Sequence, residues 1–311
     1  MGKYLKTFET HAQYEAYTAD TENFITPNVS YCVDGLDEVH YNPYVKPPIV
    51  IAKYSVTSTT TPTTITNSNY QSGFTSIEID GVVQPSIVTS YTFNTLGEHT
   101  VKYTLEDPTT ISNLSFYSCN RITSITIPDS VTSLGTNAFY ACSSLKRLNS
   151  DTDGVFNLPN GIQTIGTSAF YMCREMTKMV LPSGITKIDE SVFYQCNGLV
   201  SIGPVGSGAS LEIPNTVTTI GYGAFWHCIG MKYITIPSTV TTIANYAFAD
   251  CRIAETITCS RSTAPSIKNY TFVDVKTNGT LYVPSGSSGY NTWMSSSSYY
   301  LGYYGWTKVE Q

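Results

Sequence analysis

The chain has 311 residues, of which 41% are hydrophobic and only 13% are charged, so two or three folded units are expected. The formal net charge is -6 and no cluster of Lys or Arg occurs, which excludes a nucleic acid partner because phosphate neutralisation needs a concentrated basic face. No window approaches the roughly 18 to 20 consecutive apolar residues of a membrane helix, so no membrane insertion is expected.

Residues 1–48 are expected to form a separate N-terminal module. Thr10–Gln13 has the form of a capping box that opens a helix, and a hairpin is expected around Asp34 and Gly35. No apolar segment follows Met1, so no secretory signal is expected. The segment resembles the N-terminal modules of structural proteins from phages and prophages of gut Bacteroides-like hosts. That resemblance implies attachment to other virion proteins through this module.

Residues 49–106 are expected to form a small β-sandwich or Ig-like domain. Ile77–Val83 is a hairpin candidate, and Val101–Leu105 alternates between apolar and polar residues as a half-buried strand does. The Thr-rich stretch from Thr57 to Thr66 is expected to be a loop or a flexible connector.

A repeated Phe-x-x-Cys element dominates the rest of the chain. Its six copies begin at Phe116, Phe139, Phe170, Phe193, Phe225 and Phe248. Each of the last five copies lies eleven residues after a proline, and successive copies are 23, 31, 23, 32 and 23 residues apart. The unit is therefore about 23 residues long, with inserts in alternate units. The inserts around 149–154 and 203–208 are expected to be surface loops.

The unit that contains Phe139 shows what each copy is expected to form. Ile125 and Ile127 alternate with threonine, as in a half-buried strand, and Pro128 ends that strand by withholding a backbone donor. Apolar residues then recur within 138–145 at spacings that predict one face of a short helical turn. A single unit cannot bury its apolar face, so neighbouring units are expected to stack around a continuous core.

These units resemble the BspA-type leucine-rich repeat, which combines an Ile-Pro strand, a Val-x-x-Ile-Gly segment and an Ala-Phe-x-x-Cys turn. The resemblance covers residues 107–284 and implies a mainly β fold, a leucine-rich-repeat solenoid with short helical turns. The seventh unit has Val275 where cysteine is expected, as a terminal, capping repeat does. Residues 285–311 form an aromatic tail, with Trp293 and Trp306, that is expected to cap the C-terminal end of the solenoid.

No arrangement in the sequence carries enzyme chemistry. The four histidines have no metal or catalytic-triad spacing, and no nucleophile elbow, phosphate-binding loop or dinucleotide fingerprint occurs. The chain is therefore expected to be no enzyme and to bind neither a cofactor nor a metal. The six repeat cysteines occupy equivalent inward positions and are expected to form a buried ladder of reduced thiols. Cys32 and Cys259 remain unassigned.

An aromatic residue directly follows the repeat phenylalanine in five units. These candidate ligand-binding residues are Tyr117, Tyr140, Tyr171, Tyr194 and Trp226. Regularly spaced flat rings can grip a sugar chain or a protein partner. The alternative is that the rings only shield the convex side of the solenoid, and the sequence leaves both interpretations open.

The repeats favour a non-enzymatic structural or binding protein, because a stacked solenoid offers a long and rigid surface. Together with the N-terminal resemblance, they predict a virion-attached fibre or decoration protein of a gut bacteriophage. Such a protein lies on the virion surface, presents its solenoid to a protein or glycan on a host cell, and is commonly a homo-oligomer such as a trimer. The alternative is a leucine-rich-repeat adhesin on the bacterial cell surface, the role for which the repeat family is best known.

Overall fold

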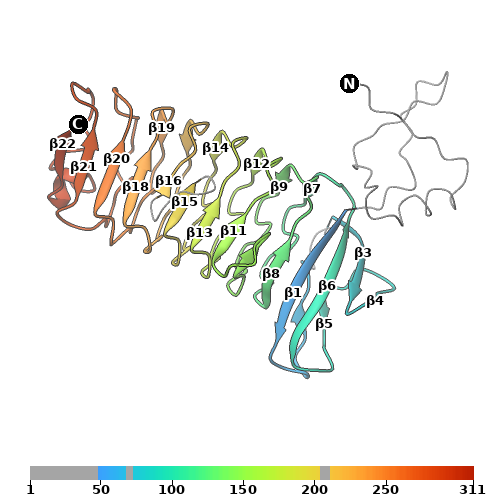
Figure 1. Cartoon of the computed structure of the whole chain (residues 1–311). Coiled ribbons are helices and arrows are strands. Elements are labelled where there is room, and N and C mark those ends of the chain that lie inside the picture. Colours follow the sequence, from blue (N-terminus) through green and yellow to red (C-terminus); the bar gives the residue numbers. More distant parts are fainter. Residues whose placement is uncertain (1–47, 68–72, 204–210) are drawn as a thin grey trace, which may run out of the picture. The chain divides into compact units, whose positions relative to one another are not determined.

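The computed structural model describes residues 48–67, 73–203 and 211–311. The helix and the hairpin expected within residues 1–48, together with Cys32 and most of the second insert, lie outside the described residues. The residues from Pro48 to Gln311 group into one unit, whose coils follow one another along a single axis (Figure 1).

One large sheet runs along this whole unit (Figure 1). Its fourteen strands are, in spatial order, β4 (Val82–Val83), β3 (Phe74–Ile79), β6 (Gly97–Leu105), β1 (Ile49–Val56), β8 (Ile122–Thr126), β10 (Arg147–Leu148), β11 (Val155–Asn157), β13 (Lys178–Val180), β15 (Ser201–Gly203), β16 (Leu211–Glu212), β18 (Tyr233–Ile236), β20 (Thr256–Cys259), β21 (Thr280–Val283) and β22 (Thr307–Glu310). The pairs from β4 to β8 are antiparallel, and all later pairs are parallel. Except at the two inserts, the chain passes along the other side of the core between one parallel strand and the next, so the repeats form the coils of a solenoid.

The second extended segment of the coils forms smaller parallel sheets. Their strands are β7 (Thr110–Ile111), β9 (Ser133–Leu134) and β12 (Thr164–Ile165) in one sheet and β14 (Lys187–Ile188), β17 (Thr219–Ile220) and β19 (Thr242–Ile243) in another. A two-stranded sheet joins β2 (Thr63–Thr64) to β5 (Ser90–Tyr91). Within the described residues, the only helix is the short 3-10 helix η1 (Leu301–Tyr304).

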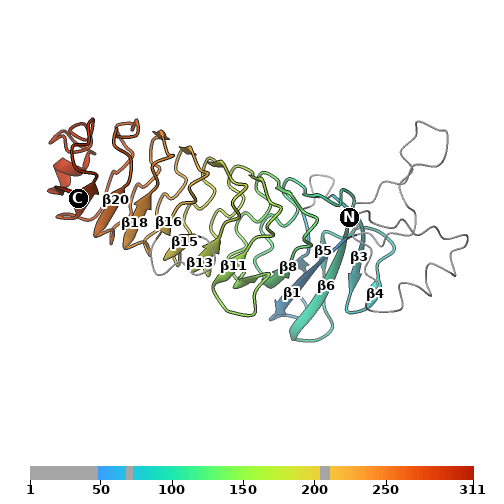
Figure 2. The ribbon, with the colours of Figure 1, turned by 45° about the horizontal axis from the view of Figure 1, so that its top comes forward.

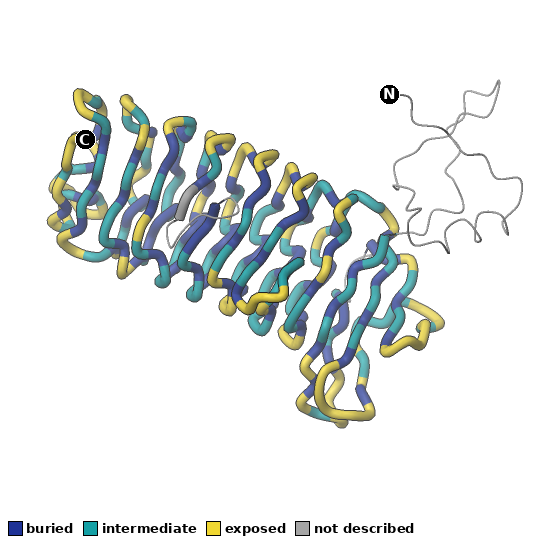
Figure 3. The backbone as a smooth tube through the Cα atoms, viewed as in Figure 1, coloured by how far each residue is buried: buried dark blue, intermediate teal, exposed yellow. Residues whose placement is uncertain are grey.

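Buried and partly exposed side chains alternate along the strands of the main sheet (Figure 3). In β20, for example, Ile257 and Cys259 are buried, whereas Thr256 and Thr258 are partly exposed. The inward residues of all coils belong to one continuous apolar core. The predicted fold class, a mainly β solenoid of stacked repeats, is thereby confirmed.

The segment around each repeat phenylalanine is a run of β-turns, not the short helical turn that the spacing predicted (Figure 2). In the coil of Phe139, the residues two before and two after the ring, Asn137 and Ala141, both have a φ of 56°. Such left-handed residues cannot continue a right-handed helix. Their strain is offset because the N–H groups of Asn137, Phe139 and Ala141 donate to carbonyl groups of the next coil at 2.7 to 2.9 Å. Neighbouring coils are therefore hydrogen-bonded through the turns as well as through the sheet.

The first insert adds a strand to the main sheet. Within one coil the chain forms β10, turns through a loop at 149–154 whose tip, residues 151–153, is exposed, and forms β11 parallel to β10, with Leu148 opposite Phe156. Phe156 is fully buried, and its ring centroid lies 6.1 Å from that of Phe170. β15 and β16 are parallel neighbours in the same way. The loop agrees with the sequence-based expectation, whereas the extra strand was not expected.

Residues 49–106 continue the repeats instead of standing apart as a sandwich domain. β1 pairs with β6 on one edge and with β8, the first repeat strand, on the other. The rings of Phe74 and Tyr103 lie 5.5 and 5.1 Å from that of Phe116. The hairpin candidate Ile77–Val83 forms the paired ends of β3 and β4. This segment covers the N-terminal end of the repeat core because an uncovered last coil would expose its apolar face to water.

The aromatic tail packs against the other end of the solenoid. Trp293 and Trp306 are buried, and their indole N–H groups donate to the carbonyl oxygens of Pro265 at 3.2 Å and Lys276 at 2.7 Å. The ring of Trp293 lies 5.1 Å from that of Phe272, the last ring in the repeat series. The tail thus covers the core while both buried indole N–H groups keep a hydrogen-bond acceptor.

Candidate binding surfaces

The six repeat phenylalanines form a single stack inside the solenoid. All are fully buried, and neighbouring rings lie 5.3 to 6.1 Å apart at interplanar angles of 5 to 14°. Phe272 continues the stack, 6.0 Å from Phe248. Close packing of identical rings holds adjacent coils in register, so the outward side chains also stand in rows.

The repeat cysteines are buried and free, which confirms the predicted ladder of reduced thiols. Each thiol from Cys142 to Cys251 donates to the carbonyl oxygen of the repeat phenylalanine one coil earlier, at 2.9 to 3.6 Å. Burial raises the pKa of these thiols, to about 12 for Cys119. Because the thiolate is the reactive form, burial makes these thiols poor nucleophiles. Cys259 is also free and buried.

A second stack of rings, the aromatic stack, runs along the turns and contains all five residues singled out from the sequence. Tyr117, Tyr140, Tyr171 and Tyr194 are nearly parallel, with ring centroids 4.4 to 4.7 Å apart and interplanar angles of 3 to 10°. Trp226 meets Tyr194 edge-on at 5.2 Å. Each of these side chains is partly exposed, so the outer edge of the stack reaches solvent.

The aromatic stack is longer than the sequence pattern indicated. Trp226 is stacked on Tyr246 at 4.6 Å, Tyr246 on Tyr270 at 5.1 Å, and Tyr270 packs against Tyr299 at 4.6 Å. Tyr246 and Tyr270 lie two residues before a repeat phenylalanine, in units that have no aromatic residue after it. A tyrosine at the same offset in two successive units was the signal that could have identified them.

Stacking decides which part of each ring a ligand can reach. The faces of interior rings such as Tyr140 and Tyr171 are covered by their neighbours, whereas a sugar ring binds by lying on a free aromatic face. Within the stack, the ring faces that a sugar-binding form of the ligand platform would use are therefore covered. Burial raises the pKa of Tyr171, and the hydroxyl groups of Tyr140 and Tyr194 raise it further. The stack thus presents ring edges and hydroxyl groups.

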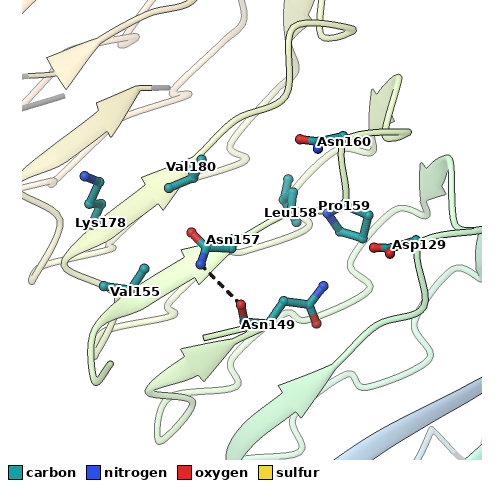
Figure 4. A pocket seen from close by; sticks show the side chains of 9 residues that line it. All are labelled: Asp129, Asn149, Val155, Asn157, Leu158, Pro159, Asn160, Lys178 and Val180. Atoms are coloured by element: carbon teal, nitrogen blue, oxygen red, sulfur yellow. Dashed lines mark hydrogen bonds between the residues drawn. The ribbon is translucent and has the colours of Figure 1, made fainter. Parts of the chain in front are cut away.

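The sheet carries a pocket where the first insert leaves it (Figure 4). The pocket has a volume of about 430 Å³, and its polar lining consists of Asp129, Asn149, Asn157, Asn160 and Lys178. A second pocket, of about 490 Å³, shares Asp129 and Asn149 and extends to Asp151. These residues were not recognised from the sequence as a site. They come from separate segments of the chain, and only the pairing of strands of unequal length brings them together.

Two histidines link neighbouring segments through carboxylates. His99 Nδ1 lies 2.6 Å from Asp80, and His227 pairs with Asp250 of the next coil. Among the residues that the structure describes, no group of three or more His, Cys, Asp or Glu side chains is placed to hold a metal ion. In the same part of the chain, no helix has the length and apolar character needed to cross a bilayer.

Comparison with protein families identifies the repeat. The BspA type leucine rich repeat region, with six copies, matches residues 63–200 and 206–300, which is most of the chain. The chain belongs to the BspA-type leucine-rich-repeat family. The match to this family begins at residue 63, in agreement with the sheet that joins 49–106 to the repeats. BspA-type solenoids are typically non-enzymatic scaffolds, and leucine-rich repeats are interaction modules.

Solved leucine-rich-repeat structures resemble this BspA-type chain in part. The leucine rich repeat protein of T. pallidum is 27% identical, with a TM-score of 0.40, over 49% of this chain and 66% of that chain. A leucine-rich repeat protein from Bacteroides ovatus is 23% identical, with a TM-score of 0.43, over 60% of this chain and 49% of that chain. The chain therefore spans between half and two thirds of their length. No curated protein matches it.

Proposed function

We propose that the chain is a non-enzymatic binding protein and that the outer edge of its aromatic stack contacts a protein on a cell surface. The observation that supports this most directly is the row of stacked tyrosine edges from Tyr117 to Tyr194 on a scaffold of interaction repeats. A tyrosine edge combines apolar area with a hydroxyl group, and tyrosine is enriched in protein interfaces for that reason. Sugar stacking is disfavoured because the ring faces are covered.

The rigidity of the solenoid is the second support for this proposal. Adjacent coils are joined through the turns, for example by the Ala141 N–H that donates to the Tyr171 carbonyl at 2.7 Å, and through the main sheet. A partner therefore meets a row of groups that is already ordered, so that little conformational entropy is lost on binding. Several copies on one particle or cell would add avidity.

Binding of the fluorescently labelled full chain to intact Bacteroides cells, measured by flow cytometry, tests this proposal. The triple variant Tyr140→Phe, Tyr171→Phe, Tyr194→Phe keeps the stacked rings but removes three hydroxyl groups, and it should weaken binding by at least about tenfold. Tyr233→Phe, at a tyrosine of β18 that is 38% exposed, is the matched control and should bind normally.

Treatment of the cells identifies the partner class. Protease should abolish binding of the unaltered chain, whereas periodate oxidation of surface glycans should leave it intact. The proposal is contradicted if binding survives protease and is lost after periodate. It is also contradicted if the triple variant and Tyr233→Phe bind equally well.

We also propose that the chain is a virion-attached fibre or decoration protein of a gut bacteriophage. The support is the resemblance of residues 1–48 to the N-terminal modules of phage and prophage structural proteins. In this proposal the module docks on the particle, and the solenoid projects from it as a homo-oligomer such as a trimer. Antibodies against the chain should then label purified phage particles. Labelling of the bacterial envelope, and not of particles, would instead favour the alternative, a cell-surface adhesin.

A further inference from the structure

The pocket on the sheet exists because β10 is only two residues long, whereas β8 and β11 on either side of it extend further. After Leu148 the chain leaves the sheet at Asn149, whose φ is 46°. The Asn149 side chain takes over hydrogen bonds of the missing strand residue. Its Oδ1 accepts from the Ile127 N–H at 2.7 Å, and its Nδ2 donates to the Ile127 carbonyl at 3.1 Å. These bonds fix the pocket in the unbound protein.

The lining of the pocket combines polar side chains with an aliphatic wall (Figure 4). Val155 of β11 and Val180 of β13 lie on neighbouring strands and form the wall. Asn157 donates to the Asn149 carbonyl at 3.2 Å, which orients its amide beside that wall. Asp129 and Asn160 are exposed at the rim. A ligand therefore meets hydrogen-bonding groups on one side and C–H groups on the other.

The backbone at the pocket does not offer an edge for an added peptide strand. Both backbone polar groups of Ile127 are bonded to Asn149, and the Leu158 N–H donates to the Val180 carbonyl at 3.3 Å. Strand addition requires free N–H and C=O groups at a sheet edge. An extended peptide is therefore a poor match to this site.

The charges and donors of the pocket favour a neutral ligand rich in hydroxyl groups. The carboxylate of Asp129 and the ammonium group of Lys178 both line the pocket, so its formal charges cancel and no net charge favours an ionic ligand, while no metal-binding group of three occurs in the described residues. Carboxylate oxygens accept from hydroxyl groups, and side-chain amides both donate and accept. Valine side chains pack against the C–H groups of a sugar ring. A volume of about 430 Å³ falls within the range of small-molecule sites.

We infer that this pocket, the Asn149 pocket, binds a neutral saccharide of one or two sugar units. The site is separate from the aromatic stack and does not depend on the function proposed for that stack. A glycan at the Asn149 pocket would place the solenoid on a cell surface while the stack contacts its protein partner. The two sites therefore differ in the chemical class that they recognise.

Saturation-transfer difference NMR with the full chain tests the inference. The probes are D-mannose, D-galactose, N-acetylglucosamine and cellobiose at up to about 50 mM, well above a millimolar Kd, with sialic acid as the anionic comparison. At least one neutral probe should bind, and sialic acid should not. The variant Asp129→Ala, Asn160→Ala should weaken binding of that probe by at least about tenfold. Both positions are exposed, so the variant should fold normally.

A matched control is Asn215→Ala, at the exposed position that follows Pro214 in another coil, as Asn160 follows Pro159. This control and the triple variant of the aromatic stack should bind the sugar normally. The inference is overturned if no neutral probe binds, if sialic acid binds as well as the neutral probes, or if binding persists in the Asp129→Ala, Asn160→Ala variant. Loss of sugar binding in the triple variant also overturns it, because the sugar then binds at the stack.

Discussion

Truncation of a central repeat phenylalanine shows how much stability the stacked core supplies. Phe170 is fully buried, and its ring contacts those of Phe139 at 5.4 Å and of Phe193 and Phe156 at 6.1 Å. Burial of such a side chain contributes about 1.5 to 3 kcal/mol, and each aromatic pair adds about 0.5 to 1.5 kcal/mol. With partial relaxation around the cavity, Phe170→Ala should lower the free energy of unfolding by about 4 kcal/mol.

Urea denaturation followed by circular dichroism measures this loss as a lower midpoint at an unchanged slope. Phe170→Leu keeps most of the apolar volume and should lower the free energy of unfolding by less than about 2 kcal/mol. Tyr303→Ala, at a tyrosine that is 55% exposed, should change it by no more than about 0.5 kcal/mol. A loss below about 1 kcal/mol for Phe170→Ala would refute the stacked core, because buried rings do not cost so little to remove.

Three further perturbations test particular contacts. Cys228→Ala removes the thiol that donates to the Phe193 carbonyl at 2.9 Å and should lower the free energy of unfolding by about 1 to 2 kcal/mol in urea; an unchanged midpoint would contradict that bond. Asn149→Ala keeps the left-handed backbone, with its φ of 46°, but removes the side-chain amide, and it should lower the free energy of unfolding by about 2 to 3 kcal/mol in the same assay. A loss below about 0.5 kcal/mol would show that the amide does not stabilise the end of β8. Burial raises the pKa of Asp80, but its hydrogen bond with His99 helps to hold that pKa below the usual 3.8. The Asp80 contribution to stability is therefore fully present above pH 3.8 and is lost as the pH falls through the lower folded pKa; Asp80→Asn should lessen this acid-induced loss, and an unaltered pH profile would contradict the interaction.

The stacking of the repeats could be predicted from the sequence because the same inward residues recur at fixed offsets. Phe139 and Cys142 lie on the buried side as their spacing from Pro128 required. The conformation of the turn could not be predicted, because the same spacing also fits a helix. Left-handed residues such as Ala141 are stable there only because the next coil accepts their N–H groups, a contact between segments about 30 residues apart.

Both surfaces depend on geometry that residue patterns do not contain. The row of aromatic residues was visible in the sequence, but the centroid spacing of 4.4 Å between Tyr140 and Tyr171, which covers the ring faces, was not. The Asn149 pocket depends on where β10 ends relative to β8 and β11, and this register is set by the hydrogen bonds between these strands. Similarly, nothing local in residues 49–106 indicated that β1 would pair with the first repeat strand.

Photo-crosslinking from the aromatic stack tests most directly the central claim that its outer edge contacts a protein. The full chain carries p-benzoylphenylalanine in place of Tyr171 in one sample and of Tyr233 in another, and each is irradiated while bound to intact cells. A covalent adduct with a cell-surface protein should form from position 171 and not from position 233. Cell-bound chains that give no protein adduct from position 171, or that give one only from position 233, would contradict the claim.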